Sequence, residues 1–436
     1  RKQADDFYAQ NSIEHYKYWH DFAEKNLFGI EINEQIARTA KMNMIIHDDG
    51  HTNVISADGL LPSEEIIKRT NNQGFVYNRF DFIVTNPPFG SSVKQTEQAY
   101  MKNYDLAMKE IDWLNSKGKS SERDNQNTEI LFMEQCYNFL REGGCLAIVI
   151  PDGILTNSSL QYVRDWLEEK FRIIAVISLP QTAFQATGAG VKSSVLFLKK
   201  YDLAISQKIQ SQKLALQDEI RVKYDYERLL TKLDNEKKNK INKLIGFDNV
   251  EGLTGKELKD SDVFKEWKKE VNNEFQERKD ELKESLLEEY TREKQRLFND
   301  YEIFMAIAED IGYDATGKAT NNNELDFIGE ELARFIVSIE KGEDSFFLSD
   351  NVDKNKIFLV KLNELEGRLD PLFYNIFVMN TMKKILNSKY NKIKFIEIID
   401  EFRGGPMGFH LHTYDYRDSG IPLLRIGNLK DVYLNP

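Results

Sequence analysis

Short apolar runs at nearly regular intervals in the first 200 residues constrain the fold of this chain more than any other feature. The runs are rich in Ile, Val, Leu and Phe and alternate little with polar residues, as expected of strands buried on both faces of a sheet. We predict strands at Leu27–Ile32, Asn53–Ser56, Phe80–Thr85, Cys145–Ile150, Ile173–Ser178 and Ser193–Leu198. Amphipathic patterns between several of them predict helices at Glu34–Ile46, Thr128–Leu140 and Leu160–Lys170.

The alternation of strands and helices predicts an α/β fold with a doubly wound, mostly parallel sheet. Residues 179–192 carry no helical pattern. We therefore expect the last two strands to form an antiparallel pair at one edge of the sheet.

Composition divides the chain into three predicted domains, at 1–201, 202–350 and 351–436. In the second, 21 of the residues in 261–300 are charged and the apolar ones recur mostly every four residues, which predicts a solvated helix that packs one face on a neighbour. The third returns to short strands, with turn signals at Gly404–Gly408 and Asp418–Gly420. A new strand pattern, Leu423–Ile426, begins shortly before Pro436, so we expect a mixed α/β domain that is cut short.

Bulk composition excludes several classes of protein. With 41% hydrophobic and 30% charged residues, the chain is neither disordered nor of low complexity. A net charge of −12 argues against non-specific coating of nucleic acid, although a local basic groove stays open. Two cysteines, Cys136 and Cys145, cannot form a disulfide framework, and no apolar run approaches the ~20 residues of a membrane span. We expect a cytoplasmic protein without membrane contact, and the spacing of the six histidines predicts no metal site.

The most informative segment is the loop Asn86-Pro87-Pro88-Phe89-Gly90, which follows a predicted strand. Open α/β sheets bind ligands at the carboxyl ends of their strands. Consecutive prolines hold the nearby carbonyls in one geometry, and the Asn86 amide adds another acceptor. Two aligned acceptors beside the Phe89 ring suit a planar base with an exocyclic amino group. An ordinary Pro-Pro strand exit is the alternative reading of the segment taken alone.

Two acidic residues follow the strands upstream of this loop. Glu31 ends the first strand and Asp58 follows the second, with 27 residues from Glu31 to Asp58 and 28 from Asp58 to Asn86. Such spacing fits successive strand–helix–strand units, so the three polar groups are expected along one edge of the sheet. A carboxylate there can accept the hydroxyls of a ribose, and each acid taken alone also suits the N-terminal end of a helix.

With these residues in place, the chain resembles DNA methyltransferases that methylate amino groups with S-adenosylmethionine, specifically the modification subunits of type I restriction systems. The resemblance rests on Phe28–Ile32, Ala40–Met44, Ala57–Leu60, Asn86–Gly90, Gly143–Pro151, Ile177–Pro180 and Ile311–Asp314. It implies the sheet of S-adenosylmethionine-dependent methyltransferases. It also implies that Glu31 binds the cofactor ribose and Asp58 its adenine, that Ile32, Gly59 and Asn86 also bind the cofactor, and that Asn86, Pro87, Pro88 and Phe89 form the catalytic loop.

The resemblance implies methylation of adenine N6 in double-stranded DNA with the target base flipped out. Specificity and restriction subunits, or a fused nuclease, are the implied partners. The family carries a glycine-rich turn after its first strand, and no glycine precedes Gly29. We therefore expect that turn to lie upstream of this chain.

The tail at Pro422–Leu429 is similar to the start of a target-recognition domain in type I specificity subunits; a simple β-hairpin is the alternative. Cytosine N4, an RNA base and a glutamine amide also present an amino group, and a non-catalytic DNA-binding subunit is a further alternative. Methylation of cytosine carbon 5 is disfavoured, because it needs an activated cysteine and both cysteines fall in core patterns.

Deletion of the residues after about Phe395 is expected to impair the choice of DNA site more than the binding of cofactor. Sequencing of methylated positions in DNA from cells that express the full-length and the deleted protein measures this effect. An unchanged set of sites would contradict the assignment of a recognition domain to the tail.

Overall fold

The computed structural model describes residues 12–47, 53–94, 99–109, 113–114, 120–188, 190–247, 255–294, 297–343, 345–390, 429–430 and 433–434. Its contacts divide the chain into two units, Arg1–Asn380 and Thr381–Pro436. In the second unit, β15 (Leu429–Lys430) pairs antiparallel with β16 (Tyr433–Leu434). The turn signals at Gly404–Gly408 and Asp418–Gly420 and the strand predicted at Leu423–Ile426 lie outside the described residues. A recognition domain in the tail therefore stays a prediction.

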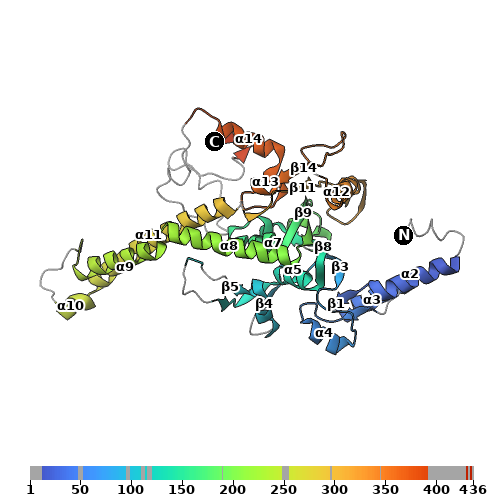
Figure 1. Cartoon of the computed structure of the whole chain (residues 1–436), viewed down its shortest axis with the longest axis horizontal. Coiled ribbons are helices and arrows are strands. Elements are labelled where there is room, and N and C mark those ends of the chain that lie inside the picture. Colours follow the sequence, from blue (N-terminus) through green and yellow to red (C-terminus); the bar gives the residue numbers. More distant parts are fainter. Residues whose placement is uncertain are drawn as a thin grey trace, which may run out of the picture. The chain divides into compact units, whose positions relative to one another are not determined.

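The first unit is built on a six-stranded sheet with the order β14-β11-β9-β10-β8-β3 (Figure 1). Its strands are β3 (Phe80–Thr85), β8 (Leu140–Pro151), β9 (Phe171–Ser178), β10 (Ser193–Lys200), β11 (Glu302–Ile307) and β14 (Ile357–Lys361). β3 runs parallel to β8, and β9 runs parallel to β11. β10 is antiparallel to both of its neighbours, and β14 is antiparallel to β11. Four strands thus share one direction, and the α/β class is confirmed.

The six predicted strands all form, but the antiparallel pair is not at an edge. The chain turns back after β9, and β10 inserts between β8 and β9, where most of its side chains are buried. The edge on that side is formed by β14 on β11 instead. These two strands come from beyond residue 201, so the sheet crosses the predicted boundaries at 201 and 350. The division of the chain into three domains remains a prediction.

β1 (Gly29–Glu31) and β2 (Val54–Ser56) form a separate parallel pair. Side chains rather than backbone hydrogen bonds join the pair to the main sheet, with the Phe28 ring 5.3 Å from the Phe80 ring. The neighbouring helices are α2 (Ser12–Asn26), α3 (Glu34–Ile46) and α4 (Ser63–Thr70). The expectation that every strand is buried on both faces is wrong for β3. Phe82 and Val84 lie on the same face of β3 and are 74% and 84% exposed, because no described element covers that face at β3.

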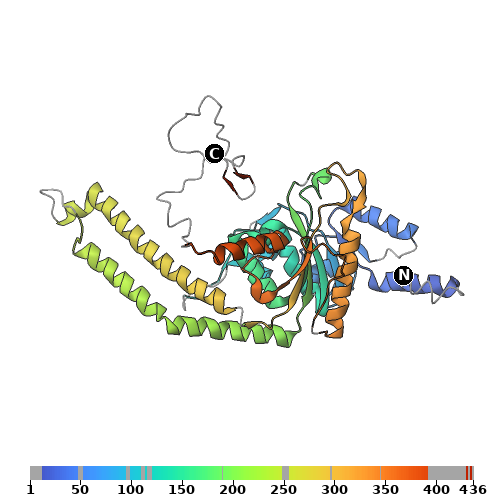
Figure 2. The ribbon, with the colours of Figure 1, turned by 90° about the horizontal axis from the view of Figure 1, so that it is seen from above.

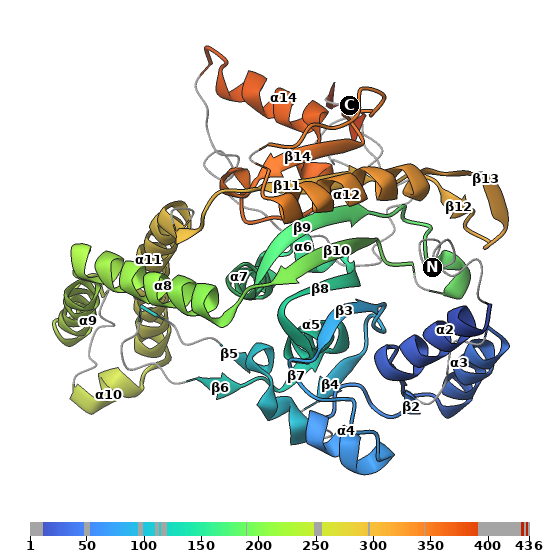
Figure 3. The ribbon, with the colours of Figure 1, turned by 45° about the vertical axis from the view of Figure 1, so that its right-hand side comes forward.

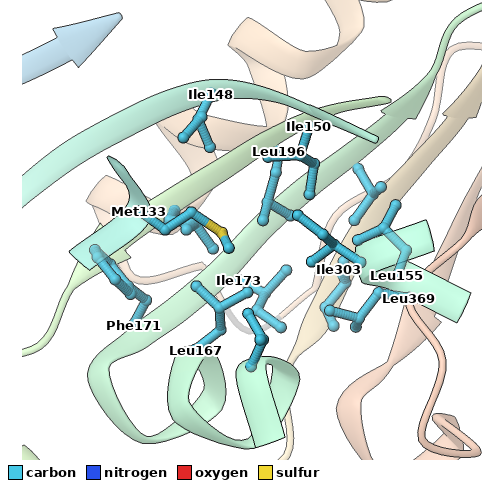
Figure 4. Packing of buried hydrophobic residues seen from close by; sticks show 14 of the residues in the cluster. Met133, Ile148, Ile150, Leu155, Leu167, Phe171, Ile173, Leu196, Ile303 and Leu369 are labelled. Carbon is cyan, nitrogen blue, oxygen red and sulfur yellow. The ribbon is translucent and has the colours of Figure 1, made fainter. Parts of the chain in front are cut away.

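Helices cover both faces of the main sheet. One face packs on α5 (Thr128–Phe139), α6 (Asp152–Thr156), α7 (Gln161–Lys170) and α13 (Pro371–Tyr374), with a continuous apolar core that includes Met133, Leu167 and Ile173 (Figure 4). The other face packs on α12 (Glu324–Lys341). The remaining short elements of this unit are β4 (Ser92–Lys94), η1 (Ala99–Asn103), η2 (Asp105–Ala107), β5 (Met108–Lys109), β6 (Ser121–Glu122), β7 (Asn125–Asn127), η3 (Ser158–Leu160), η4 (Gln185–Thr187), β12 (Ile311–Tyr313), β13 (Ala319–Asn323) and η6 (Leu362–Glu364), and α14 (Ile376–Leu386) continues into the second.

A helical arm connects β10 to β11 (Figure 2). It comprises α8 (Leu203–Lys223), α9 (Tyr226–Asn242), α10 (Gly255–Asp260) and α11 (Asp262–Lys294). α11 packs its apolar stripe on α8 and α9, as predicted for a solvated helix with one buried face. At its base, Lys294 donates to Asp165 and Glu168 of α7, at 2.6 and 2.7 Å. In the part of the chain that the structure describes, no helix has both the length and the hydrophobicity to cross a lipid bilayer.

A buried lysine ties the end of β10 to the beginnings of β3 and β8. The ammonium of Lys200, which is 5% exposed, donates to the Asn78 side chain and to the carbonyls of Tyr137 and Leu140, at 2.7–2.8 Å. Burial lowers the pKa of Lys200 to about 8. The three bonds offset much of the cost of burying this charge.

Lys200→Met is expected to lower the free energy of unfolding by about 2–3 kcal/mol, because it removes the donor to three acceptors, of which the bond to Leu140 is buried and the other two are partly buried. The matched control is Lys199→Met on the same strand, whose side chain is only partly buried. Urea denaturation followed by circular dichroism measures both variants. Equal loss of stability in the two would contradict the role of the Lys200 bonds.

Candidate active site

The loop predicted to carry the chemistry begins directly after β3. Asn86 is exposed, Pro87 is buried and Phe89 is half-buried. Gly90 has a φ of +73°, and a Cβ added there would contact nothing within 4 Å. The glycine is therefore needed for its backbone conformation and not for space.

The first turn of α5 holds this loop. The Thr128 hydroxyl donates to the Pro88 carbonyl at 2.9 Å, and the Thr128 N–H donates to the Ser91 carbonyl at 3.1 Å. The Gly90 N–H donates to the buried Glu129 carboxylate, whose pKa burial raises. β4 and β7 then pair antiparallel and close the loop at its far side. Residues 86–91 are thus fixed at both ends.

Two acceptors on the loop stay available. Among the described residues, neither the Asn86 side chain nor the Pro87 carbonyl takes part in a hydrogen bond, whereas the next carbonyl, that of Pro88, is occupied by Thr128. Two free acceptors on a fixed backbone can receive two N–H bonds from one amino group.

The same helix holds the loop after β2. The Gln135 side chain donates to the carbonyls of Gly59 and Leu61, at 2.9 and 2.8 Å. A Cβ added to Gly59 would lie 3.1 Å from the Phe132 ring, so the backbone approaches α5 closely at this point. Phe132 is one helical turn, about 6 Å along the axis, beyond Thr128. The loops that carry Asp58 and Asn86 are therefore attached to neighbouring turns of one helix.

Asp58 is half-buried and both of its oxygens are engaged. One accepts the Leu60 N–H at 3.0 Å and the other accepts the Tyr100 hydroxyl at 2.9 Å. Burial and the bond to Asp58 both raise the pKa of Tyr100, so the hydroxyl remains a donor. Each Asp58 oxygen keeps a lone pair for a further donor.

Glu31 ends β1, and its carbonyl accepts the Ala57 N–H, so it lies beside the end of β2. One carboxylate oxygen accepts the Asn33 N–H at 2.7 Å, and the other has no partner among the described residues. Ile32 is exposed. Asn33 caps α3 by accepting from the Gln35 and Ile36 N–H groups, which fixes the turn after Glu31.

The segment between β4 and β7 supports the Asp58 loop from a second side. The Tyr104 hydroxyl donates to the Leu60 carbonyl at 2.6 Å. Glu134 of α5 accepts the N–H groups of Asp105 and Leu106, at 2.7 and 2.8 Å. Burial raises the pKa of Glu134 to about 7.

A second aromatic ring lies against Phe89. Phe184, in the loop between β9 and β10, meets it edge-on, with ring centroids 5.9 Å apart and an interplanar angle of 83°. Two rings at nearly a right angle form a corner that can hold one face and one edge of a flat ligand.

Sequence reasoning placed Asn86 and Asp58 at strand ends but missed Thr128, Glu129, Tyr100 and Phe184. Tyr100 lies in a stretch without a periodic pattern, so nothing in the sequence marks it. Phe184 lies in the loop at the carboxyl end of the predicted strand Ile173–Ser178, so its position in the sequence could have marked it as a candidate site residue.

The two cysteines differ in burial. Cys136 is buried, and desolvation raises the pKa of its thiol to about 12, while Cys145 is half-buried. Both are free thiols. Outside the loops described above, His20, Asp21 and Glu24 of α2 bring three possible metal-ligand atoms within 4.8 Å of one another, on a largely exposed face.

Comparison with known proteins identifies relatives. A family model described as N-6 DNA methylase matches residues 6–284. The methylase subunit of the type I restriction enzyme MpnII from Mycoplasma pneumoniae is 29% identical over 179 residues, which is 40% of this chain and 30% of that protein. The methylase subunit of the type I restriction enzyme EcoKI from Escherichia coli is 26% identical over 180 residues, 40% of this chain and 28% of that protein.

Among solved structures, the M protein of the type I restriction enzyme EcoKI aligns with 47% of this chain and 36% of its own, at 23% identity and a TM-score of 0.31. The matched region thus spans about a third of the length of these relatives.

Glu134→Gln is expected to change how stability depends on pH. The folded protein keeps the Glu134 proton up to about pH 7, whereas the unfolded chain releases it near pH 4.5, so the free energy of unfolding falls as pH rises between these values. The expected fall from this group is about 1–3 kcal/mol. Urea denaturation of both proteins at pH 5 and pH 7.5 measures it. An equally steep fall in the glutamine variant would contradict the assignment.

Proposed function

The chain belongs to the N-6 DNA methylase family, whose model matches well over half of it, and from this we propose that it transfers a methyl group from S-adenosylmethionine to N6 of an adenine in DNA. We further propose that it acts within a restriction–modification system. The observation that carries the proposal is the pair of free acceptors on the Asn86–Pro87 segment beside the Phe89 ring.

The two acceptors explain how a weak nucleophile could be activated. The N6 lone pair of adenine is delocalised into the ring. Hydrogen bonds from its two protons to the Asn86 side chain and the Pro87 carbonyl would orient the amino group and make the nitrogen more tetrahedral. The new N6–carbon bond forms as the sulfur–carbon bond of the donor breaks, and N6 releases one proton to solvent. Because Thr128 and Glu129 fix the loop, this arrangement costs little reorganisation at the moment of reaction.

The aromatic corner supports a flipped base as the substrate. A base inside the duplex cannot reach a loop at a sheet edge, and extruding it costs a few kcal/mol. Stacking on Phe89, with Phe184 at the edge of the base, would offset part of this cost, since such stacking contributes about 1–3 kcal/mol per base.

The residues near the loop fit the proposed cofactor. The free oxygen of Glu31 can accept a ribose hydroxyl, and the remaining lone pairs of Asp58 can accept from an adenine amino group. Ile32 offers apolar surface beside Glu31, and the backbone of Gly59 lies next to Asp58. When bound, S-adenosylmethionine supplies a methyl group already activated by a sulfonium. Glu31 and Asp58 would hold and orient it.

The charge of the chain favours a partner in DNA binding. With a net charge of −12, general attraction to phosphates is weak, so selection of a site would rest on a recognition domain or on a specificity subunit. A restriction subunit or a fused nuclease would then supply cleavage. Two free thiols and a DNA substrate fit a cytoplasmic location.

Asn86→Ala in the full-length protein is expected to lower methyl transfer at least about 100-fold and to leave duplex binding and folding intact. The side chain is exposed and has no described partner, so its loss removes an acceptor without disturbing the core. Transfer of radiolabelled methyl groups to DNA measures the rate, and digestion of the product to nucleosides identifies the methylated base.

The matched control is Asn239→Ala, an exposed asparagine of α9. Wild-type turnover in Asn86→Ala would remove the assigned role of the loop. A methylated cytosine or RNA base in place of N6-methyladenine would contradict the proposed substrate, although methyl transfer to an amino group would stand.

A further inference from the structure

The β12–β13 hairpin contacts the loop that carries Phe184. The Tyr313 hydroxyl, at the end of β12, donates to the Ala183 carbonyl at 3.2 Å. A Cβ added to Gly317 in the hairpin turn would lie 3.2 Å from the Ala186 side chain. Ala183 and Ala186 flank Phe184 on both sides. Figure 3 shows the hairpin projecting from the end of β11, beyond the sheet.

Hydrogen bonds in its turn and at its base hold the hairpin in shape. In its turn, Asp314 accepts the N–H groups of Thr316 and Lys318 and the Thr316 hydroxyl, at 2.6–3.1 Å. At its base, Glu324 accepts the N–H groups of Glu309 and Asp310 and pairs with Lys356 at 2.6 Å. These bonds close the hairpin at its turn and tie its base to the end of β11 and the start of α12.

The Phe184 loop is held by short-range bonds and by an apolar cluster, in which Leu179 and Ala183 are buried and against which Phe184 packs. Ala183, Gln185 and Gly188 each donate to a carbonyl three residues earlier in the chain. Gln181 donates to the Gly190 carbonyl and closes the base of the loop. Ala183 packs in the same apolar cluster as Ile311 at the start of β12. These local bonds set the shape of the loop. Its position against Phe89 also depends on its contacts with the β12–β13 hairpin and the apolar cluster.

We propose that the β12–β13 hairpin sets the position of Phe184 against Phe89, with Tyr313 as a positioning residue for the reaction. This inference rests on the proposed function, in which the two rings receive the target base. Tyr313 does not touch the base and acts through the Ala183 carbonyl. The hairpin thereby couples β11 and α12 to the aromatic corner of the site.

The test is Tyr313→Phe in the full-length protein, which removes one hydroxyl and keeps the ring. Hydrogen–deuterium exchange of peptides covering residues 181–188 is expected to rise about fivefold, as for the loss of one hydrogen bond. The kcat for methyl transfer is expected to fall about tenfold, while the KM values for DNA and S-adenosylmethionine stay within about twofold. A merely structural defect would not separate kcat from KM in this way.

The matched control is Tyr374→Phe, which removes a hydroxyl bound to the Arg368 carbonyl and the Glu366 N–H. It is expected to leave both exchange at 181–188 and kcat unchanged. Unchanged exchange in Tyr313→Phe would overturn the contact, and raised exchange with an unchanged kcat would overturn the positioning role. A parent protein that transfers no methyl group would count against the proposed function, and exchange would still decide whether the hairpin holds the loop.

Discussion

Attachment to α5 is the constraint on which the geometry of the candidate site depends. Thr128 and Glu129 hold the loop after β3, Phe132 and Gln135 hold the loop after β2, and Glu134 holds the segment that carries Tyr100. All of these contacts fall within about 10 Å along one buried helix. Three loops from different parts of the chain therefore share one rigid support. Relative movement between them would require some of these contacts with α5 to break.

The elements of the fold could be read from the sequence because local periodicity determines them. Helix Glu34–Ile46 and strand Phe80–Thr85 have the predicted bounds, and the other predicted strands and helices differ mainly at their ends. Their neighbours in the sheet could not be read in this way. The insertion of β10 between β8 and β9, and the pairing of β11 with β9, depend on contacts between residues far apart in sequence. Strand periodicity does not encode them.

Some residues of the candidate site could likewise be predicted from the sequence, and others could not. The single sheet edge expected for Glu31, Asp58 and Asn86 is wrong, because β1 and β2 form a pair separate from the sheet that contains β3. The placement of Asn86 and Asp58 after apolar strands was nevertheless predictable, because polar residues that follow such strands mark their carboxyl ends. Their partners were not, because Thr128, Tyr100 and Phe184 reach the loops only after the chain has folded. The exposure of β3 is a further example. Its residues are as apolar as those of β9, yet two of them face away from any described element.

The parallel pairing of β11 with β9 also shapes how the molecule can form. Ile307 aligns with Ser178, and the whole helical arm lies between them in sequence. A ribosome that adds about 5–20 residues per second needs roughly 6 to 26 s to make the intervening 128 residues. During that time the nascent β9 presents an unpaired, strongly apolar edge, which is a surface that chaperones bind and that other chains can join. The arm thus delays completion of the sheet during synthesis.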